Sequence, residues 1–470
     1  MPPFAVPPKP HGHTRGVLAL MAGAPRRLLA HRFAREVLTL QVGSFATMGL
    51  QFVTSVIIAN LLNAAPFGVY YQARSLLDLV AMLANLAVGQ ALITRLAAAH
   101  ARGDDEETLR LMAYFLKVGL TVSFVEAGVG LLGGSYLGAV VLDDPEIGQL
   151  ARILFVSPPL LVVFNMVVLA LQSTRQVKQL TLLENGALIT GSVLNLAAVA
   201  LGGGVSGLLW TVAFTPLLTS GAALLVYRST CPRMAGFPSL GEIARAAPYI
   251  PYRRYFAFSA LVSVDKNFAN LLALAPTILL GRLASDAEVA CFRVAFNLMN
   301  FLTVPLAPIS RNLYAKLSEV ASKRGPQLGT TLLRVTLVSG SISVAATTLM
   351  LIAAPYVLLI YRPEYMGALA VMYALGPRFA LLGFGVGLGP IYQVLNAMRL
   401  AIVTKVLPAL IMFGGGWVMV GQYQAVGAAL TLVVAYVVGD ITNAVLVPWM
   451  LRNARARSLA TETATVQRES

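Results

Sequence analysis

The chain contains few charged residues, few histidines and almost no cysteine. Charged side chains make up 12% of its 470 residues, against about 25% in a typical soluble domain, whereas hydrophobic residues make up 57% and the mean hydropathy is +0.74. No water-soluble domain of this length would show such values, because too few polar side chains remain to cover its surface. The composition therefore predicts a polytopic membrane protein.

Motifs for metal binding, disulfide formation and ATP hydrolysis are also missing. The four histidines form no HxxxH pattern and the two cysteines no CxxC pattern, so we expect neither a metal site nor a cofactor. Cys231 and Cys291 fall on opposite sides of the membrane in the topology predicted below, which argues against a disulfide between them. A GxxxxGK[ST] motif is absent, and the predicted outer loops are too short for a catalytic domain. These absences favour a protein that is not an enzyme.

Long apolar runs recur along the whole sequence. A transmembrane helix needs about 20 predominantly apolar residues. Runs of this length lie near residues 38–62, 69–94, 111–133, 152–172, 179–202, 205–227, 255–281, 287–310, 330–360, 366–397, 400–420 and 424–450. We therefore predict an all-α polytopic membrane protein with about twelve transmembrane helices.

Basic residues are distributed unevenly between the predicted loops. The chain has 35 Lys and Arg against 20 Asp and Glu, a net charge of +15. Most of the basic residues fall in alternate connections and in the two terminal tails, as the positive-inside rule requires of cytoplasmic segments. The N-terminal segment has only a short apolar run, 17–22, followed by Arg26 and Arg27, which favours a cytoplasmic tail over a cleaved signal peptide. We predict that both termini are cytoplasmic, and that the excess charge reflects topology and anionic lipid, with no nucleic acid as partner.

A sparse internal repeat relates the two halves of the chain. Placing Asn60 on Arg282 also places Ala73 on Ala295, and it aligns the first two predicted helices with the seventh and eighth. Two halves of the same topology are common in transporters, so we predict two pseudo-symmetric six-helix bundles. The predicted domains are a basic cytoplasmic tail (1–36), an N-terminal bundle (37–228), a cytoplasmic linker (229–251), a C-terminal bundle (252–451) and a cytoplasmic tail (452–470).

The predicted helix from Phe256 to Arg282 carries unusual side chains for a membrane span. One polar stripe along it consists of Ser259, Ser263, Lys266 and Asn270. An ionisable side chain at this depth costs about 3 kcal/mol, so it normally faces protein or water. Lys266 and, in a later helix, Arg378 lie too far from the ends of their helices to reach the membrane surface easily. We expect both to face a central cavity and to contact an anionic ligand.

Other charged and polar side chains also lie within predicted spans. Arg74 and Asp78 are one helical turn apart, and a local ion pair, contact with the outer surface and contact with substrate are all open to them. The candidate cavity residues are Lys266, Arg378, Arg293, Arg74, Asn270, Asn297 and Asn300. The candidate ion-coupling residues are Asp265, Glu126 and Asp440, with the alternative that Asp265 neutralises a neighbouring charge. Small polar residues in membranes also hydrogen-bond to neighbouring helices, and we favour this role for the Ser and Thr positions.

The segment 58–98, IANLLNAAPFGVYYQARSLLDLVAMLANLAVGQALITRLAA, resembles the corresponding segment of polysaccharide and lipid-linked oligosaccharide (O-antigen) flippases of the Wzx type. The matching positions are Gly68, Tyr70, Ala73, Gly89, Ala91 and Arg95. The segment 292–309, FRVAFNLMNFLTVPLAPI, is similar to the eighth helix of that family, with Ala295 and Pro305 in the expected places. These flippases belong to the multidrug/oligosaccharidyl-lipid/polysaccharide (MOP) exporter superfamily. The matching positions concern the fold, so the resemblance transfers no functional residue.

The resemblance implies translocation of undecaprenyl-pyrophosphate-linked oligosaccharide units across a bacterial inner membrane, for synthesis of lipopolysaccharide O-antigen or exopolysaccharide. The implied partners are the lipid-linked oligosaccharide, membrane lipids, and polysaccharide polymerase or export machinery. A diphosphate crossing the membrane needs cationic contacts, which Lys266, Arg378 and either Arg293 or Arg74 would provide in a cavity between the bundles. The bundles would rock to expose this cavity to each side in turn. With no ATPase motif in the chain, an ion gradient, the membrane potential or removal of product would drive the transport.

Two alternatives to a flippase stay open. A multidrug or cation antiporter of the same superfamily would need a predominantly acidic cavity, and Lys266 and Arg378 argue against one. A membrane-embedded polysaccharide polymerase is disfavoured by the short outer loops. The leaflet in which the unpolymerised lipid-linked unit accumulates would separate a missing flippase (inner leaflet) from a missing polymerase (outer leaflet).

Overall fold

The computed structural model describes residues 32–84, 88–231, 236–306, 327–388, 391–392 and 397–469. Most of the tail predicted for residues 1–36 lies outside these residues, as does the side chain of Asp265. The chain divides into two compact units, Met1–Gly49 and Leu50–Ser470. The described part of the first unit is helical and forms the beginning of α2 (Arg32–Leu62). The other helices belong to the second unit, and the predicted domain boundaries within it stay a prediction.

The described residues form helices and no strand, which confirms the predicted all-α fold class. The helices after α2 are α3 (Ala64–Ala84), α4 (Val88–Ala101), α5 (Asp105–Leu142), α6 (Pro145–Leu154), α7 (Ser157–Ser173), α8 (Val177–Ala200), α9 (Gly204–Thr230), α10 (Leu240–Ala246), α11 (Arg253–Leu283), α12 (Asp286–Asn300), α14 (Gln327–Leu358), α15 (Ala368–Leu381) and α17 (Met398–Glu469), with the 3-10 helices η2 (Ala247–Tyr249), η3 (Phe301–Leu306), η4 (Pro363–Tyr365) and η5 (Leu382–Gly385). Seven helical segments of the described chain are long and apolar enough to cross a bilayer. The protein is therefore a multi-pass membrane protein, while the count of twelve spans and the cytoplasmic termini stay predictions.

Local sequence signals fix the ends of α5 and the start of α6. The carboxylate of Asp104 accepts a hydrogen bond from the backbone N–H of Glu107 at 3.0 Å, which caps the first turn of α5. Asp143 ends α5 in the left-handed conformation with φ 63°. Asp144 then caps α6, whose first residue is Pro145, a position where the missing N–H costs nothing.

Two predicted spans, 400–420 and 424–450, lie within the long helical segment α17. Gln424 interrupts it with φ 50° and ψ −128°, a conformation that residues with a side chain rarely adopt. Gln424 therefore separates two helices, close to the boundary that the sequence predicts.

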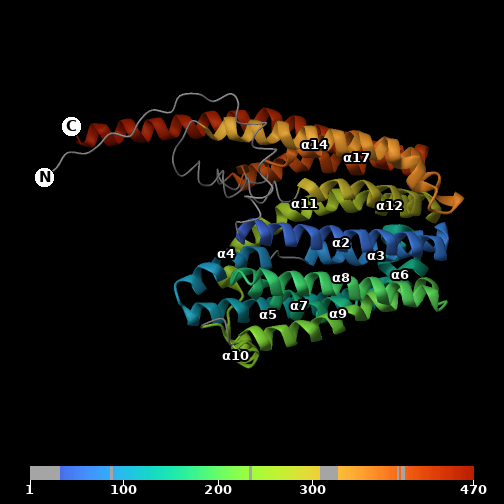
Figure 1. Cartoon of the computed structure of the whole chain (residues 1–470), viewed down its shortest axis with the longest axis horizontal. Coiled ribbons are helices and arrows are strands. Elements are labelled where there is room, and N and C mark those ends of the chain that lie inside the picture. The colour runs from blue at the N-terminus through green and yellow to red at the C-terminus, as the bar shows by residue number, and fades with distance from the viewer. Residues whose placement is uncertain are drawn as a thin grey trace. The chain divides into compact units, whose positions relative to one another are not determined.

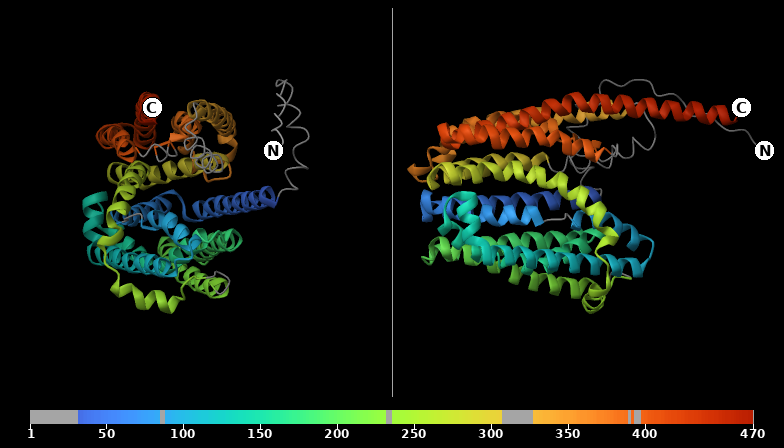
Figure 2. Two further views of the ribbon diagram at one scale, coloured as in Figure 1. Left: turned by 90° about the vertical axis from the view of Figure 1, so that its left-hand side faces the viewer. Right: turned by 180° about the vertical axis from the view of Figure 1, so that it is seen from behind.

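Helices α11 and α12 join the earlier helices of the Leu50–Ser470 unit to the later ones. Figure 1 shows them between α3 and the pair α14 and α17, and Figure 2 shows the same order from two further sides. α12 packs on α3 and α15, and α11 packs on α17 and α3. One large apolar cluster fills this junction and includes Phe67 of α3, Phe292 of α12 and Leu432 of α17. A second cluster holds α4, α5, α7 and α9 together.

The segment before α11 is bound to the earlier helices. The hydroxyl of Tyr227 in α9 donates a hydrogen bond to the carbonyl of Pro238 at 2.6 Å. The ammonium of Lys117 in α5 donates to the carbonyls of Pro248 at 2.8 Å and Ile250 at 2.9 Å. These contacts fix the cytoplasmic end of α11, in the predicted topology, to α5 and α9.

Candidate functional site

A cavity of about 620 Å³ lies between α3, α4, α5 and α7, and α11 contributes Lys266 to its wall. Its volume falls within the range of roughly 300–1,000 Å³ that is usual for small-molecule sites. The charged residues in its wall are Arg74, Asp78, Glu126 and Lys266. Three of the predicted site residues, Arg74, Glu126 and Lys266, are thus brought together around one space.

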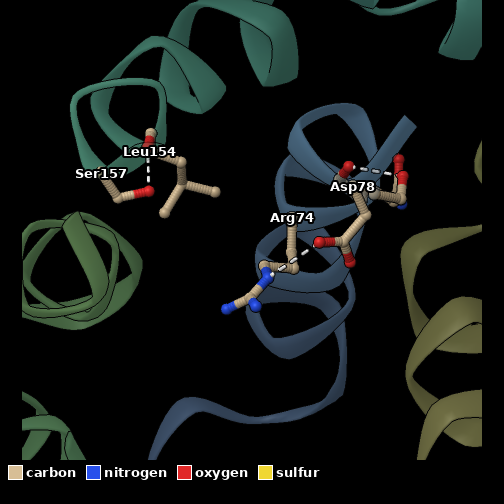
Figure 3. Close-up of polar contacts among 6 residues, drawn as sticks. Arg74, Asp78, Leu154 and Ser157 are labelled. Carbon is tan, nitrogen blue, oxygen red and sulfur yellow. Dashed lines mark hydrogen bonds and ion pairs between the residues drawn. The ribbon is translucent and has the colours of Figure 1, made fainter. Parts of the chain in front are cut away.

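Helix α3 presents Arg74 and Asp78 to this cavity as an ion pair. Nε of Arg74 lies 3.4 Å from Oδ1 of Asp78, one turn further along the helix. The two side chains keep 40% and 43% of their surface exposed, and both line the cavity. In Figure 3 the terminal nitrogens of the Arg74 guanidinium point away from Asp78. Of the roles left open by the sequence, the local ion pair is present, and contact with a substrate stays a prediction for two residues that both line the cavity.

Glu126 adds a second carboxylate to the cavity wall from α5. Its side chain is only 8% exposed, and it makes no hydrogen bond or ion pair with any residue that the structure describes. The cavity therefore contains both signs of charge, with Arg74 and Lys266 as cations and Asp78 and Glu126 as carboxylates. It is a cavity of mixed charge, and Arg74 is already partly neutralised by Asp78.

Arg293 of α12 lies beside the Arg74–Asp78 pair without lining the cavity. Its guanidinium carbon is 5.1 Å from the centre of the Tyr71 ring, a cation–π contact. It interacts electrostatically with Tyr71, Asp78 and Arg74. Its Nε is buried and has no hydrogen-bond partner within the described part of the chain. Arg293 thus extends the positive charge of this region from α3 toward α12.

The three predicted asparagines do not line the cavity. The Asn297 side-chain amide donates a hydrogen bond to the Tyr71 hydroxyl at 2.9 Å and so supports the ring under Arg293. Asn270 is exposed on α11, and Asn300 is half-buried at the end of α12. Asn297 therefore has a positioning contact in this structure, whereas Asn270 and Asn300 lie outside the cavity wall.

Arg378 lies in a different place, between α15 and α17. Its guanidinium carbon is 3.7 Å from the centre of the Tyr436 ring, and Asp440, one turn further along α17, interacts with it electrostatically. Arg378 and Asp440 are both absent from the wall of the cavity that contains Lys266. The two deepest predicted cations therefore do not share a site in this structure.

This environment predicts a packing role for Arg378. We expect Arg378→Gln to lower the free energy of unfolding by about 1–2 kcal/mol, because the stacked contact with Tyr436 is lost, and to leave affinity for a ligand of the cavity that contains Lys266 within about twofold. The measurements are thermal unfolding and ligand binding of the purified protein, with the exposed Arg399→Gln as control. Lost binding with unchanged unfolding would instead assign Arg378 to the substrate site.

Hydrogen bonds connect the two halves of the chain at the end predicted to face outward. The Asn60 side chain donates to the carbonyl of Ile360 at 2.8 Å and accepts from the backbone N–H of Arg362 at 3.0 Å. The position aligned with Asn60 by the internal repeat is Arg282, whose guanidinium donates to the carbonyl of Val140. Equivalent residues of the two halves thus each donate a hydrogen bond to a backbone carbonyl of the other half.

Helices α3 and α12 also approach closely at this end. A Cβ atom on Gly68 would lie 1.9 Å from the carbonyl oxygen of Asp286, so only glycine fits. One turn further on, the Gln72 side chain donates a hydrogen bond to the Asp286 carboxylate at 2.6 Å. Gly68 and Gln72 therefore bring the two halves into direct contact.

Two side-chain amides in the cavity wall were not singled out from the sequence. Asn165 and Gln172 of α7 line the same cavity as Lys266. They are two helical turns apart in an otherwise apolar helix. That spacing could have identified them, although uncharged amides carry a weaker signal than charges do.

A family model described as polysaccharide biosynthesis protein matches residues 33–320, more than half of the chain. The chain belongs to the polysaccharide biosynthesis protein family. No curated protein sequence matches it. Membership is consistent with a cavity whose wall contains both cations and amides.

Solved structures similar to this polysaccharide biosynthesis protein are transporters of the MOP superfamily. An inward-facing multidrug resistance MATE family transporter is 16% identical, with a TM-score of 0.68 over 87% of this chain and 94% of that one. An outward-facing one is 17% identical, with a TM-score of 0.61 over 92% and 98%. A MOP-superfamily transporter from Pyrococcus furiosus, described as having a binding pocket of reverse polarity, is 16% identical, with a TM-score of 0.65 over 92% and 98%. These likenesses confirm the MOP-superfamily fold, while the Wzx type stays a prediction.

Proposed function

We propose that this protein is a flippase that moves undecaprenyl-pyrophosphate-linked oligosaccharide units across the bacterial inner membrane by alternating access. One observation carries the proposal: Arg74 and Lys266, from the two predicted bundles, line one cavity. A diphosphate needs charge-assisted hydrogen bonds to leave water, and an arginine and a lysine can supply them. Because these cations come from different halves, a bound diphosphate would bridge the halves.

The hydrogen bonds at the predicted outer end support an inward-facing state. Asn60, Arg282 and the Gln72–Asp286 pair hold the halves together there. In alternating access these contacts break when the cavity opens outward. A substrate would therefore enter from the cytoplasm while they are intact.

The membrane potential favours the proposed direction. Moving one elementary charge across the membrane is worth about 2.3 kcal/mol per 100 mV. With the cytoplasm negative, the electrostatic free energy of an anionic diphosphate falls when it moves outward. Glu126 offers a carboxylate for a coupled proton or sodium ion, so both sources of energy are available to this cavity.

The second candidate function is a multidrug or cation antiporter. Asp78 and Glu126 favour it, because carboxylates in a cavity attract cationic substrates. Asp78 is occupied by Arg74, however, and Lys266 adds a further positive charge to the same wall. The formal charges of the four charged wall residues cancel, so the anionic substrate is supported by the family match and by the two cations from different halves, and not by the net charge of the cavity.

The proposed function is tested with the purified protein in liposomes loaded with undecaprenyl-pyrophosphate-linked N-acetylglucosamine. We expect transfer of the sugar to the other leaflet, measured by its accessibility to an added glycosyltransferase, to be at least tenfold faster than in protein-free liposomes. Transport of ethidium against a proton or sodium gradient without acceleration of the lipid would establish the antiporter instead. A polymerase would lengthen the saccharide without moving it.

A further inference from the structure

We infer that α7 carries a saccharide-recognition subsite of the cavity, in which Asn165 and Gln172 select the sugar of the lipid-linked substrate and favour uncharged sugars. This inference rests on the proposed function and adds to it the chemistry of the sugar and the residues that recognise it. The subsite is distinct from the Arg74–Lys266 pair, which contacts the diphosphate.

The polar residues of α7 differ in their contacts: the two amides line the cavity, whereas Ser173 bonds to the helix backbone. The residues of α7 in the cavity wall form one stripe and are Ser157, Pro158, Leu161, Val162, Asn165, Val168, Leu169 and Gln172. The hydroxyl of Ser157 donates a hydrogen bond to the carbonyl of Leu154 at 2.7 Å, which leaves the two amides as the polar groups without a partner on this stripe of the described chain. Asn165 and Gln172 lie two turns apart on this stripe. Ser173, which is not on the stripe, is buried and donates its hydroxyl to the carbonyl of Ala170 instead. The side-chain amides of α7 are therefore aimed at the cavity.

Both amides are open to a ligand. Asn165 and Gln172 are exposed to the cavity space, and neither side chain makes a hydrogen bond with a residue in the described ranges. An amide without a partner is costly within an apolar span, so a cavity position with a polar ligand is the favourable one. Each amide offers both donors and acceptors, which matches the hydroxyl groups of a sugar.

Helix α5 supplies an aromatic ring and a carboxylate to the wall of the same cavity. Phe115 of α5 lines the same cavity, and its ring lies 3.4 Å from the position of a Cβ on Gly89. The ring is buried in the apolar cluster of α4, α5, α7 and α9 and makes this part of the wall apolar. Glu126, also of α5, has no cationic partner within the described residues and would repel an acidic sugar. The combination selects a neutral saccharide over a uronic acid.

The experiment measures binding of three probes to the full-length protein in nanodiscs. The probes are undecaprenyl pyrophosphate, the same carrier bearing N-acetylglucosamine, and the carrier bearing a uronic acid. We expect the wild type to bind the N-acetylglucosamine carrier more tightly than the other two. The double variant Asn165→Leu/Gln172→Leu should lose about tenfold in affinity for that carrier, as two hydrogen bonds are removed, with affinity for bare undecaprenyl pyrophosphate unchanged.

Two further variants separate recognition from packing. Met166→Leu changes the same turn of α7 on its buried side and should leave all three affinities unchanged. Glu126→Gln should raise affinity for the uronic-acid carrier relative to the neutral one. Equal wild-type affinity for all three probes, or an equal loss for bare and glycosylated carrier in the α7 double variant, would overturn the subsite and leave the flippase proposal standing. Failure of the wild type to bind any of the three would overturn both.

Discussion

Replacing Arg74 and Lys266 together by glutamine should abolish translocation of the lipid-linked saccharide. Both residues line the cavity, and a hydrogen bond to a charged group contributes about 1.5–3 kcal/mol, or roughly tenfold to 100-fold in affinity for each cation lost. Glutamine is shorter than both side chains, but its amide keeps a hydrogen-bond donor while the charge is removed. We therefore expect each single variant to be impaired and the double variant to fall to the protein-free rate.

The measurement is the liposome assay, together with polysaccharide export in a deletion strain that expresses each variant at equal membrane abundance. Lys266→Arg should retain activity, because a cation is kept. Arg102→Gln, at an exposed position in the α4–α5 connection, is the matched loss of a positive charge outside the cavity. Normal export by the double variant would show that the cavity does not hold the diphosphate.

One complication comes from the ion pair on α3. Arg74→Gln leaves the Asp78 carboxylate, whose side chain is 43% exposed, without the partner that lies 3.4 Å away, and loss of such a partly exposed ion pair costs up to about 1 kcal/mol by itself. The variant Arg74→Gln/Asp78→Asn removes both charges. If transport stays lost in this neutral pair while the protein unfolds at the wild-type temperature, the missing contribution is the cation and not the stability of α3.

The fold could be predicted from the sequence because hydropathy reports directly on a membrane environment. Each predicted span contains a helix of the structure in its described part, and even the break at Gln424 falls near a predicted boundary. The side chains of Asn60 and Arg282, which the internal repeat pairs, each donate to a backbone carbonyl, while the division into two bundles stays a prediction. Such features depend on composition and spacing along the chain, which the sequence contains.

The composition of the candidate site was harder to predict. Helical spacing gives the position of a residue along its own helix and the face on which it lies, but it does not identify the helix that packs against that face. Lys266 and Arg378 look equivalent in sequence, yet Lys266 faces the cavity while Arg378 stacks on Tyr436. Asn165 and Gln172 were missed because an uncharged amide in a span is as easily explained by contact with a neighbouring helix. Only the packing of α7 against α5 decides between these roles.

Gly68→Val should prevent the two halves from closing at the predicted outer end. A Cβ at this position would lie 1.9 Å from a backbone oxygen of Asp286, and backbone cannot rotate away as a flexible side chain does. Relief requires α3 and α12 to separate, which also breaks the hydrogen bond between Gln72 and Asp286. Overpacking of this kind costs about 1–3 kcal/mol, enough to shift a two-state equilibrium by roughly fivefold to 150-fold.

The shift is measured by labelling a cysteine in the cavity from outside. Val122, which lines the cavity, is replaced by cysteine in a protein whose native Cys231 and Cys291 are changed to alanine. We expect a membrane-impermeant maleimide to label this cysteine at least fivefold faster with Gly68→Val, while export falls because the inward-facing state is depleted. Gly128→Val, on α5 where a Cβ meets no atom within 4 Å, should change neither the labelling rate nor export. Unchanged labelling with lost export would mean that the contact stabilises the fold in both states, and that the closure of α3 on α12 is not the outer gate.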